Sequence, residues 1–162
     1  MAKYDVVNEA VIAATPGEIV AAFLDEAAGR SRWWQPVLQM RPRGDKPLPE
    51  IGAMVDITVS AEAGFGQRFG TTFRGRVTAF EPDRRLVLEY FEGDFRGTDE
   101  WRLDPVDAGH TRIRTRWKTD PQGAIRLAAR LVNVPGSYSK VMQQGFRAME
   151  RFTADRRAGS QA

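Results

Sequence analysis

Five stretches of alternating apolar and polar residues follow one another between residues 53 and 118, and this pattern restricts the fold more than any other feature of the chain. In the last stretch, Ile113, Thr115 and Trp117 share one face, while Arg and Lys occupy the other. Short turns rich in Gly, Asp and Pro separate the stretches, which predicts consecutive antiparallel strands. One apolar and one charged face are typical of a sheet that covers a core and meets water on its other side. The predicted strands are residues 53–60, 70–80, 85–92, 97–104 and 110–118.

The N-terminal segment predicts a sixth strand followed by a helix. Residues 4–13 contain Val, Ile and Tyr, which favour strands. Thr15, Pro16 and Glu18 then form the pattern of a capped helix start, with Pro at the first helical position. A short second helical turn is predicted around residues 31–34.

A long amphipathic helix is predicted at the C-terminal end, from Ser137 onward. Its apolar side should lie on the apolar face of the sheet, and residues 122–132 form a shorter helical segment before it. Residues 1–156 therefore form one α+β domain, and residues 157–162 are predicted to be a flexible tail. The apolar side of the long helix consists of Val141, Met142, Gly145, Phe146, Met149 and Phe152.

Two segments are predicted to be loops. Residues 35–50 contain four prolines and several charges, which predicts a long surface connection of the kind that often forms a lid or binding loop. Residues 64–70 are rich in Gly but have no helix after them, so a phosphate-binding loop is not favoured. We interpret them as a hairpin at a cavity mouth, where Phe65 or Phe69 could act as a gate.

Composition excludes several classes of function. The chain has no Cys and a single His, His110, so thiolate or imidazole metal sites are not expected, and no cofactor is indicated. No apolar run reaches the roughly 20 residues that span a bilayer, and no signal sequence precedes the first strand, which predicts a soluble, cytoplasmic protein. The net charge is only +3, so an ion-paired sheet face is favoured over a nucleic-acid surface. Both a monomer and a homodimer remain open.

The order of strand, capped helix, short helix, five strands and long helix resembles that of the START-like or SRPBCC superfamily, which includes polyketide cyclase/dehydrase-like proteins. The resemblance covers roughly residues 4–155. It implies a helix-grip fold, in which a curved six-stranded antiparallel sheet wraps around a long C-terminal helix, with two short helices between the first two strands. The motifs that carry it are residues 11–20 (VIAATPGEIV), 33–36 (WWQP), 76–86 (RVTAFEPDRRL) and 109–113 (GHTRI).

The resemblance also implies a pocket between the sheet and the long helix. Side chains on the apolar face then either pack the core or contact a ligand, and the sequence does not separate these roles. The predicted ligand-binding residues are Phe23, Trp34, Phe73, Val77, Leu88, Tyr90, Trp101, Thr115, Trp117, Met142, Phe146 and Met149.

Asp99 and Tyr90 are weak candidates for catalytic residues. Asp99 shares strand parity with Trp101 and Leu103, so its side chain could point inward. A carboxyl group there should have a raised pKa and could act as a general base. The alternative, which we favour from sequence, is a solvated Asp at a strand end paired with Arg96.

Three functions are compatible with this sequence. The first is binding, and possible transport, of a hydrophobic small molecule such as a lipid, a polyketide or an aromatic metabolite. The second is an enzyme of the cyclase/dehydrase kind that uses polar residues of the pocket. The third is a protein-interaction module similar to the chaperone activators of the same superfamily, acting through Arg112, Arg114 and Arg116.

Overall fold

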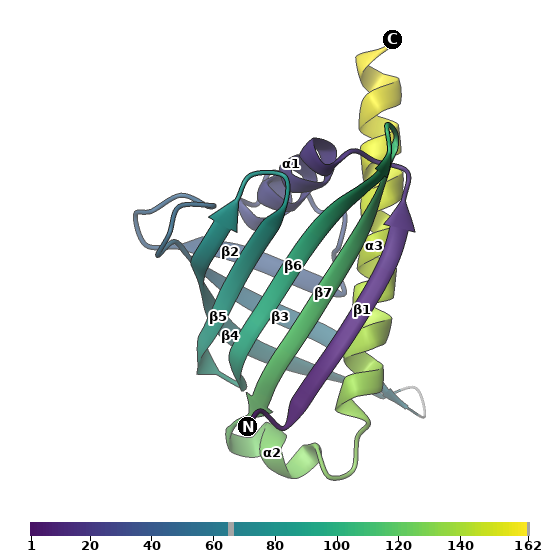
Figure 1. Ribbon diagram of the computed structural model, residues 1–162. Helices are drawn as coiled ribbons and strands as arrows, with labels where there is room; N and C mark the ends of the chain where they lie inside the picture. The colour runs from purple at the N-terminus through teal and green to yellow at the C-terminus, as the bar shows by residue number, and fades with distance from the viewer. Residues whose placement is uncertain (65–66, 162) are drawn as a thin grey trace.

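The computed structural model describes residues 1–64 and 67–161 and has an α+β fold, in which a curved sheet wraps around a long C-terminal helix (Figure 1). Phe65 and the side chain of Phe69 lie outside this description, so their predicted role as a gate stays a prediction. The elements are β1 (Tyr4–Ile12), α1 (Pro16–Ala27), β2 (Leu38–Arg43), β3 (Met54–Gly64), β4 (Gln67–Glu81), β5 (Arg85–Gly93), β6 (Phe95–Asp107), β7 (His110–Pro121), α2 (Gly123–Ala128) and α3 (Val134–Ser160).

Over the described residues, seven strands form one antiparallel sheet in the order β1-β7-β6-β5-β4-β3-β2. The strands from β2 to β7 therefore pair in chain order, as the short turns predicted. The N-terminal strand β1 joins the far edge by pairing with β7, with Val6 opposite Trp117. The sheet curves so that one face encloses α3, and α1 covers one end of the enclosed space (Figure 1).

The prediction of six strands and two short helices is wrong in two respects, and both concern residues 31–43. Residues 38–43 form β2, the additional strand, whereas residues 33–37 form bends and turns rather than a helix. The strand has a weak sequence signal because only Leu38 and Met40 alternate as buried apolar residues before Pro42. Proline is tolerated here because β2 is an edge strand. An edge strand has no neighbour on its outer side, so a missing amide donor on that side removes no hydrogen bond between strands.

The helix α3 continues to Ser160, so residues 157–160 of the predicted tail are helical. Ion pairs explain this extension. Arg157 pairs with Glu18 at 2.8 Å, and Arg156 pairs with Asp25 at 2.6 Å, which links the last turns of α3 to α1. The N-terminus of α1 has the predicted capping box, because the backbone of each of Thr15 and Glu18 donates to the side chain of the other.

The convex face of the sheet carries a network of cross-strand ion pairs. Arg116 on β7 binds Asp5 on β1 through two hydrogen bonds, of 2.9 and 2.7 Å. Arg85 on β5 donates two hydrogen bonds to a single oxygen of Glu100 on β6, and the other oxygen of Glu100 accepts from Arg102. Exposed pairs of this kind stabilise a fold by at most about 1 kcal/mol each. The basic residues of the strands are therefore largely matched by acidic neighbours.

The middle of α3 approaches the turn before β2 closely at Gly145. A Cβ atom added to this residue would lie 2.4 Å from the ring of Trp34, so only glycine leaves room for the indole. The indole Nε1 of Trp34 donates a 3.3 Å hydrogen bond to the Val141 carbonyl one turn earlier. Trp34 thus fixes the position of α3 relative to the turn that precedes β2.

Candidate functional site: an internal cavity

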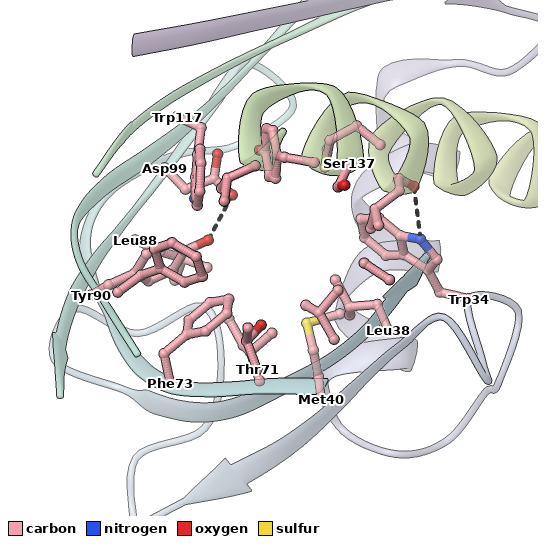
Figure 2. A pocket seen from close by; sticks show the side chains of 18 of the residues that line it. Trp34, Leu38, Met40, Thr71, Phe73, Leu88, Tyr90, Asp99, Trp117 and Ser137 are labelled. Atoms are coloured by element: carbon pink, nitrogen blue, oxygen red, sulfur yellow. Dashed lines mark hydrogen bonds between the residues drawn. The ribbon is translucent and has the colours of Figure 1, made fainter. Parts of the chain in front are cut away.

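A largely apolar cavity lies between the concave face of the sheet and the first turns of α3 (Figure 2). The space open to the centre of a water molecule is about 60 Å³, whereas all space free of atoms, including the mouth, is about 710 Å³. The smaller value describes the enclosed space, because the larger one includes open solvent. It corresponds to roughly four to six water molecules. The wall consists of Phe23, Trp34, Leu38, Met40, Ile57, Val59, Ala61, Thr71, Phe73, Leu88, Tyr90, Phe95, Asp99, Trp101, Trp117, Val134, Ser137, Tyr138, Val141 and Met142.

The structure brings together eight of the twelve residues predicted to bind a ligand, and it also places Asp99 in the same wall. The eight are Phe23, Trp34, Phe73, Leu88, Tyr90, Trp101, Trp117 and Met142. Their contact with a ligand stays a prediction.

Val77, Thr115, Phe146 and Met149 are buried but are not part of the cavity wall. Phe146 and Met149 lie farther along α3 than the turns that cover the cavity. Phe146 packs instead edge-on against Trp101, with ring centroids 6.0 Å apart. These two side chains thus help to pack the core at the end where α3 and the sheet are in direct contact.

Several wall residues are absent from the predicted set. Leu38 and Met40 come from β2, which was expected to be a loop. Val59 extends the inward parity of Ile57 on β3, and this alternation is visible in the sequence. Tyr138 and Val134 come from the start of α3, and their position depends on how the helix docks rather than on a local pattern.

Asp99 is buried in the cavity wall and is held by two hydrogen bonds to one oxygen atom. The Tyr90 hydroxyl donates to Asp99 Oδ2 at 3.0 Å (Figure 2). The Trp101 indole donates to the same oxygen at 3.1 Å. The interpretation of Asp99 as a solvated residue paired with Arg96 is therefore wrong, because the residue is only 5% exposed. Its strand parity with Trp101, which turns both side chains to the concave face, explains the burial.

Burial raises the pKa of Asp99 from 3.8 to about 6, because desolvation outweighs the hydrogen bonds from Trp101 and Tyr90 that favour the charged form. Tyr138 also lowers the pKa of this carboxyl, although no hydrogen bond of normal geometry joins the two groups. Burial raises the pKa of both Tyr90 and Tyr138 well above 10, so both phenols are neutral. The carboxyl group can thus exchange a proton near neutral pH.

Asp99 Oδ1 is buried without a hydrogen-bond partner within the described part of the chain. Three polar atoms on other buried side chains share this property: Thr115 Oγ1, Trp117 Nε1 and Tyr138 Oη. A buried polar group without a partner costs about 1–3 kcal/mol, so such atoms in a cavity wall indicate a site that a polar group can complete. The acceptor Asp99 and the indole donor of Trp117 are neighbours, because the two residues pair across β6 and β7.

The described residues contain neither a cluster of metal-ligating side chains nor a membrane-spanning helix. No group of three or more His, Cys, Asp or Glu side chains among them could hold a metal ion. His110 lies at the turn between β6 and β7, where Asp107 contacts its ring at 2.9 Å. None of the helices, over the residues that the structure describes, is long and apolar enough to span a bilayer.

An antiparallel sheet closed around a long C-terminal helix, with an apolar cavity between them, defines a helix-grip protein of the START-like (SRPBCC) superfamily. Within it, the chain belongs to the polyketide cyclase/dehydrase and lipid transport family, whose model matches residues 3–151. The prediction of this superfamily from the sequence is confirmed.

Solved structures with the same fold include an aromatase/cyclase, a major latex-like protein and Ara h 8.0201. The Zhui aromatase/cyclase from Streptomyces sp. R1128 superposes with a TM-score of 0.66 and is 15% identical, over 94% of this chain and 94% of that chain. The major latex-like protein 151 from Panax ginseng gives a TM-score of 0.63 at 11% identity, over 93% and 97%. Ara h 8.0201 gives 0.61 at 14% identity, over 94% and 98%. At such identities the likeness shows the fold alone, and no curated protein sequence matches the chain.

Proposed function

We propose that this protein binds a hydrophobic small molecule, such as a lipid, a polyketide or an aromatic metabolite, in its internal cavity. The observation that carries the proposal is the cavity wall, in which apolar and aromatic side chains surround a small number of polar groups. Sites for small organic ligands have this composition, because the apolar wall supplies affinity and the polar groups fix orientation. The family description, which includes lipid transport, supports the same function.

The size of the cavity limits the ligand. About 60 Å³ open to water centres accommodates a ligand of one or two aromatic rings, and a third ring, as in N-phenyl-1-naphthylamine, would extend into the mouth of the cavity. A longer ligand requires side chains at the wall to move, and Met40 and Leu38 on the edge strand β2 have the fewest strand neighbours to restrain them.

Two measurements test the binding function. Native mass spectrometry of the purified protein should show an added mass from a co-purified ligand, or from an added hydrophobic compound. Titration with N-phenyl-1-naphthylamine, which is uncharged at neutral pH, should give saturable fluorescence enhancement. Absence of both signals would contradict the proposal.

Catalysis of the cyclase/dehydrase kind is a second candidate, and the buried Asp99 with its Tyr90 hydrogen bond favours it. A carboxyl group whose pKa is about 6 can take a proton from carbon next to a carbonyl group and later return it. The Tyr138 hydroxyl, which also lies in the cavity wall and has no hydrogen-bond partner within the described residues, would donate to the carbonyl oxygen. Incubation with a synthetic poly-β-ketone should then give a cyclised product that Asp99→Asn abolishes. Equal product yield with and without the wild-type protein would remove this candidate.

The interaction module has less support. Arg116 and Arg112 on β7 already pair with Asp5 and Glu9 on β1, so two of the three arginines that would contact an acidic partner are matched within the sheet.

A further inference from the structure

Asp99 is the charged residue of the cavity wall, and its charge has no counterion there. Within the described wall, no Lys, Arg or His accompanies it. The neighbours that act on the carboxyl are Tyr90 on β5, Trp101 on β6 and Tyr138 on α3, none of which carries a positive charge. An ionised carboxylate without a cationic partner is costly inside a protein, and a paired one is far less so.

The hydrogen bonds around Asp99 leave one of its oxygens available. Tyr90 and Trp101 both donate to Oδ2, which orients the carboxyl group and stabilises its charge. Oδ1 is buried and has no hydrogen-bond partner within the described residues. The carboxylate can therefore accept a further donor without giving up the bonds that hold it.

Aromatic rings surround the same position. Trp117 stacks on Tyr138 with ring centroids 4.2 Å apart, and Phe95 meets Trp117 edge-on at 5.0 Å. Phe73 lies against Tyr90 at 4.7 Å (Figure 2). The stacking of Trp117 and Tyr138 covers one face of each ring. A ring face that is open to the cavity attracts a cation by about 0.5–2 kcal/mol, with the larger values in desolvated sites. A carboxylate set among aromatic rings is the environment that an ammonium group prefers.

We propose that the natural ligand is a hydrophobic amine, whose ammonium group pairs with the Asp99 carboxylate while its apolar body fills the rest of the cavity. This inference rests on the proposed binding function. The ligand supplies the positive charge that the wall lacks. A carboxylate or phosphate ligand would instead place a second anion beside Asp99, where repulsion is strong because little water separates the charges. A neutral alcohol could donate to Asp99 but would leave its charge unmatched.

Three probes with one aromatic body test the inference: 1-naphthylmethylamine, 1-naphthylmethanol and 1-naphthoate. Calorimetric titration at pH 7.5 should show the amine binding at least about tenfold more tightly than the alcohol, with the acid weakest. Asp99→Asn should remove the preference for the amine and leave the affinity for the alcohol within about threefold. Asp104→Asn is the matched control, because Asp104 lies on the exposed face of the same strand, and it should change nothing.

The wild-type protein provides a second test that needs no variant. The amine probe stays protonated between pH 5 and 7.5, and the titratable groups that face Asp99 are the neutral Tyr90 and Tyr138. Preference for the amine should therefore weaken as the pH falls through about 6, where Asp99 takes up a proton in the free protein.

The outcomes separate the two proposals. If the alcohol binds as tightly as the amine, if the acid binds most tightly, or if Asp99→Asn keeps the amine preference, the amine inference is overturned while the binding function stands. If none of the three probes nor N-phenyl-1-naphthylamine binds, the binding function itself fails.

Discussion

Tyr90 reaches Asp99 diagonally across the ladder between β5 and β6, because the residue directly opposite Tyr90 is Gly97. On its other side Tyr90 pairs with Gly75 of β4, and a Cβ atom there would lie 3.2 Å from the Tyr90 ring. Gly75 thus gives the phenol ring the room to lie along the sheet, whereas a Cβ atom at Gly97 would meet the backbone of β7. The hydrogen bond to Asp99 follows from this register.

Tyr90→Phe should raise the pKa of Asp99, because it removes a donor that stabilises the charged carboxylate. A hydrogen bond to a charged group contributes about 1.5–3 kcal/mol, so we expect a rise of about one pKa unit or more. The measurement is a carboxyl-carbon NMR titration. Tyr4→Phe is the control, since Tyr4 is not among the neighbours that shift the pKa of Asp99. An unchanged Asp99 pKa in Tyr90→Phe would show that the hydrogen bond does not act on the charge.

The effect of Asp99→Asn on stability should depend on pH. The free energy of unfolding of the variant, relative to that of the wild type, should be higher at pH 7.5 than at pH 4. The folded state holds the Asp99 proton more tightly than the unfolded chain does, since the pKa of Asp99 rises from 3.8 to about 6 on folding. Stability from this group is therefore fully present below about pH 4 and is lost as the pH rises through 6. The difference corresponds to roughly 3 kcal/mol.

Urea unfolding at pH 4, 5, 6 and 7.5 measures this effect as the difference in unfolding free energy between Asp99→Asn and the wild type. Other titrating groups are shared by the two proteins and cancel. A difference that does not change with pH would mean that the Asp99 carboxyl group is not desolvated.

Gly145→Ala should destabilise the fold although alanine favours helices. The added methyl group would meet the Trp34 ring at 2.4 Å, and overpacking of this kind costs about 1–3 kcal/mol. Gly159→Ala, in the same helix, has nothing within 4 Å of the new methyl group and should be neutral or stabilising by up to about 1 kcal/mol. Thermal unfolding compares the two. Equal melting temperatures would contradict the close packing of α3 on Trp34.

Strand parity predicts much of the sheet and part of the site. Phe73, Tyr90, Trp101 and Trp117 are inward in the sequence pattern, and all four lie in the cavity wall. Strand parity also allowed an inward side chain at Asp99. The solvated alternative is wrong, because Tyr90 and Trp101 donate hydrogen bonds to the buried carboxyl group. Parity works here because the side-chain period of a strand is local and does not depend on distant contacts.

The rest of the site depends on tertiary packing. The apolar side of α3 is evident from the helical spacing of its apolar residues. Which of these residues face the cavity depends on how α3 packs on the rest of the protein: Met142 faces the cavity, whereas Phe146 packs against Trp101. That packing rests on the approach of Gly145 to Trp34, two residues far apart in the chain. The strand β2 escaped prediction because two alternating apolar residues before a proline are too few to distinguish a strand from a loop.

The most direct test of the account fills the cavity and measures binding. Thr71 is buried in the cavity wall, whereas its neighbour Thr72 is exposed on the opposite face of β4. Thr71→Phe should lower the affinity for N-phenyl-1-naphthylamine at least about tenfold, because the added ring occupies the space that the ligand needs. Thr72→Phe introduces the same side chain on the solvated face and should bind like the wild type. Wild-type affinity in a folded Thr71→Phe protein would contradict the claim that this cavity is the binding site.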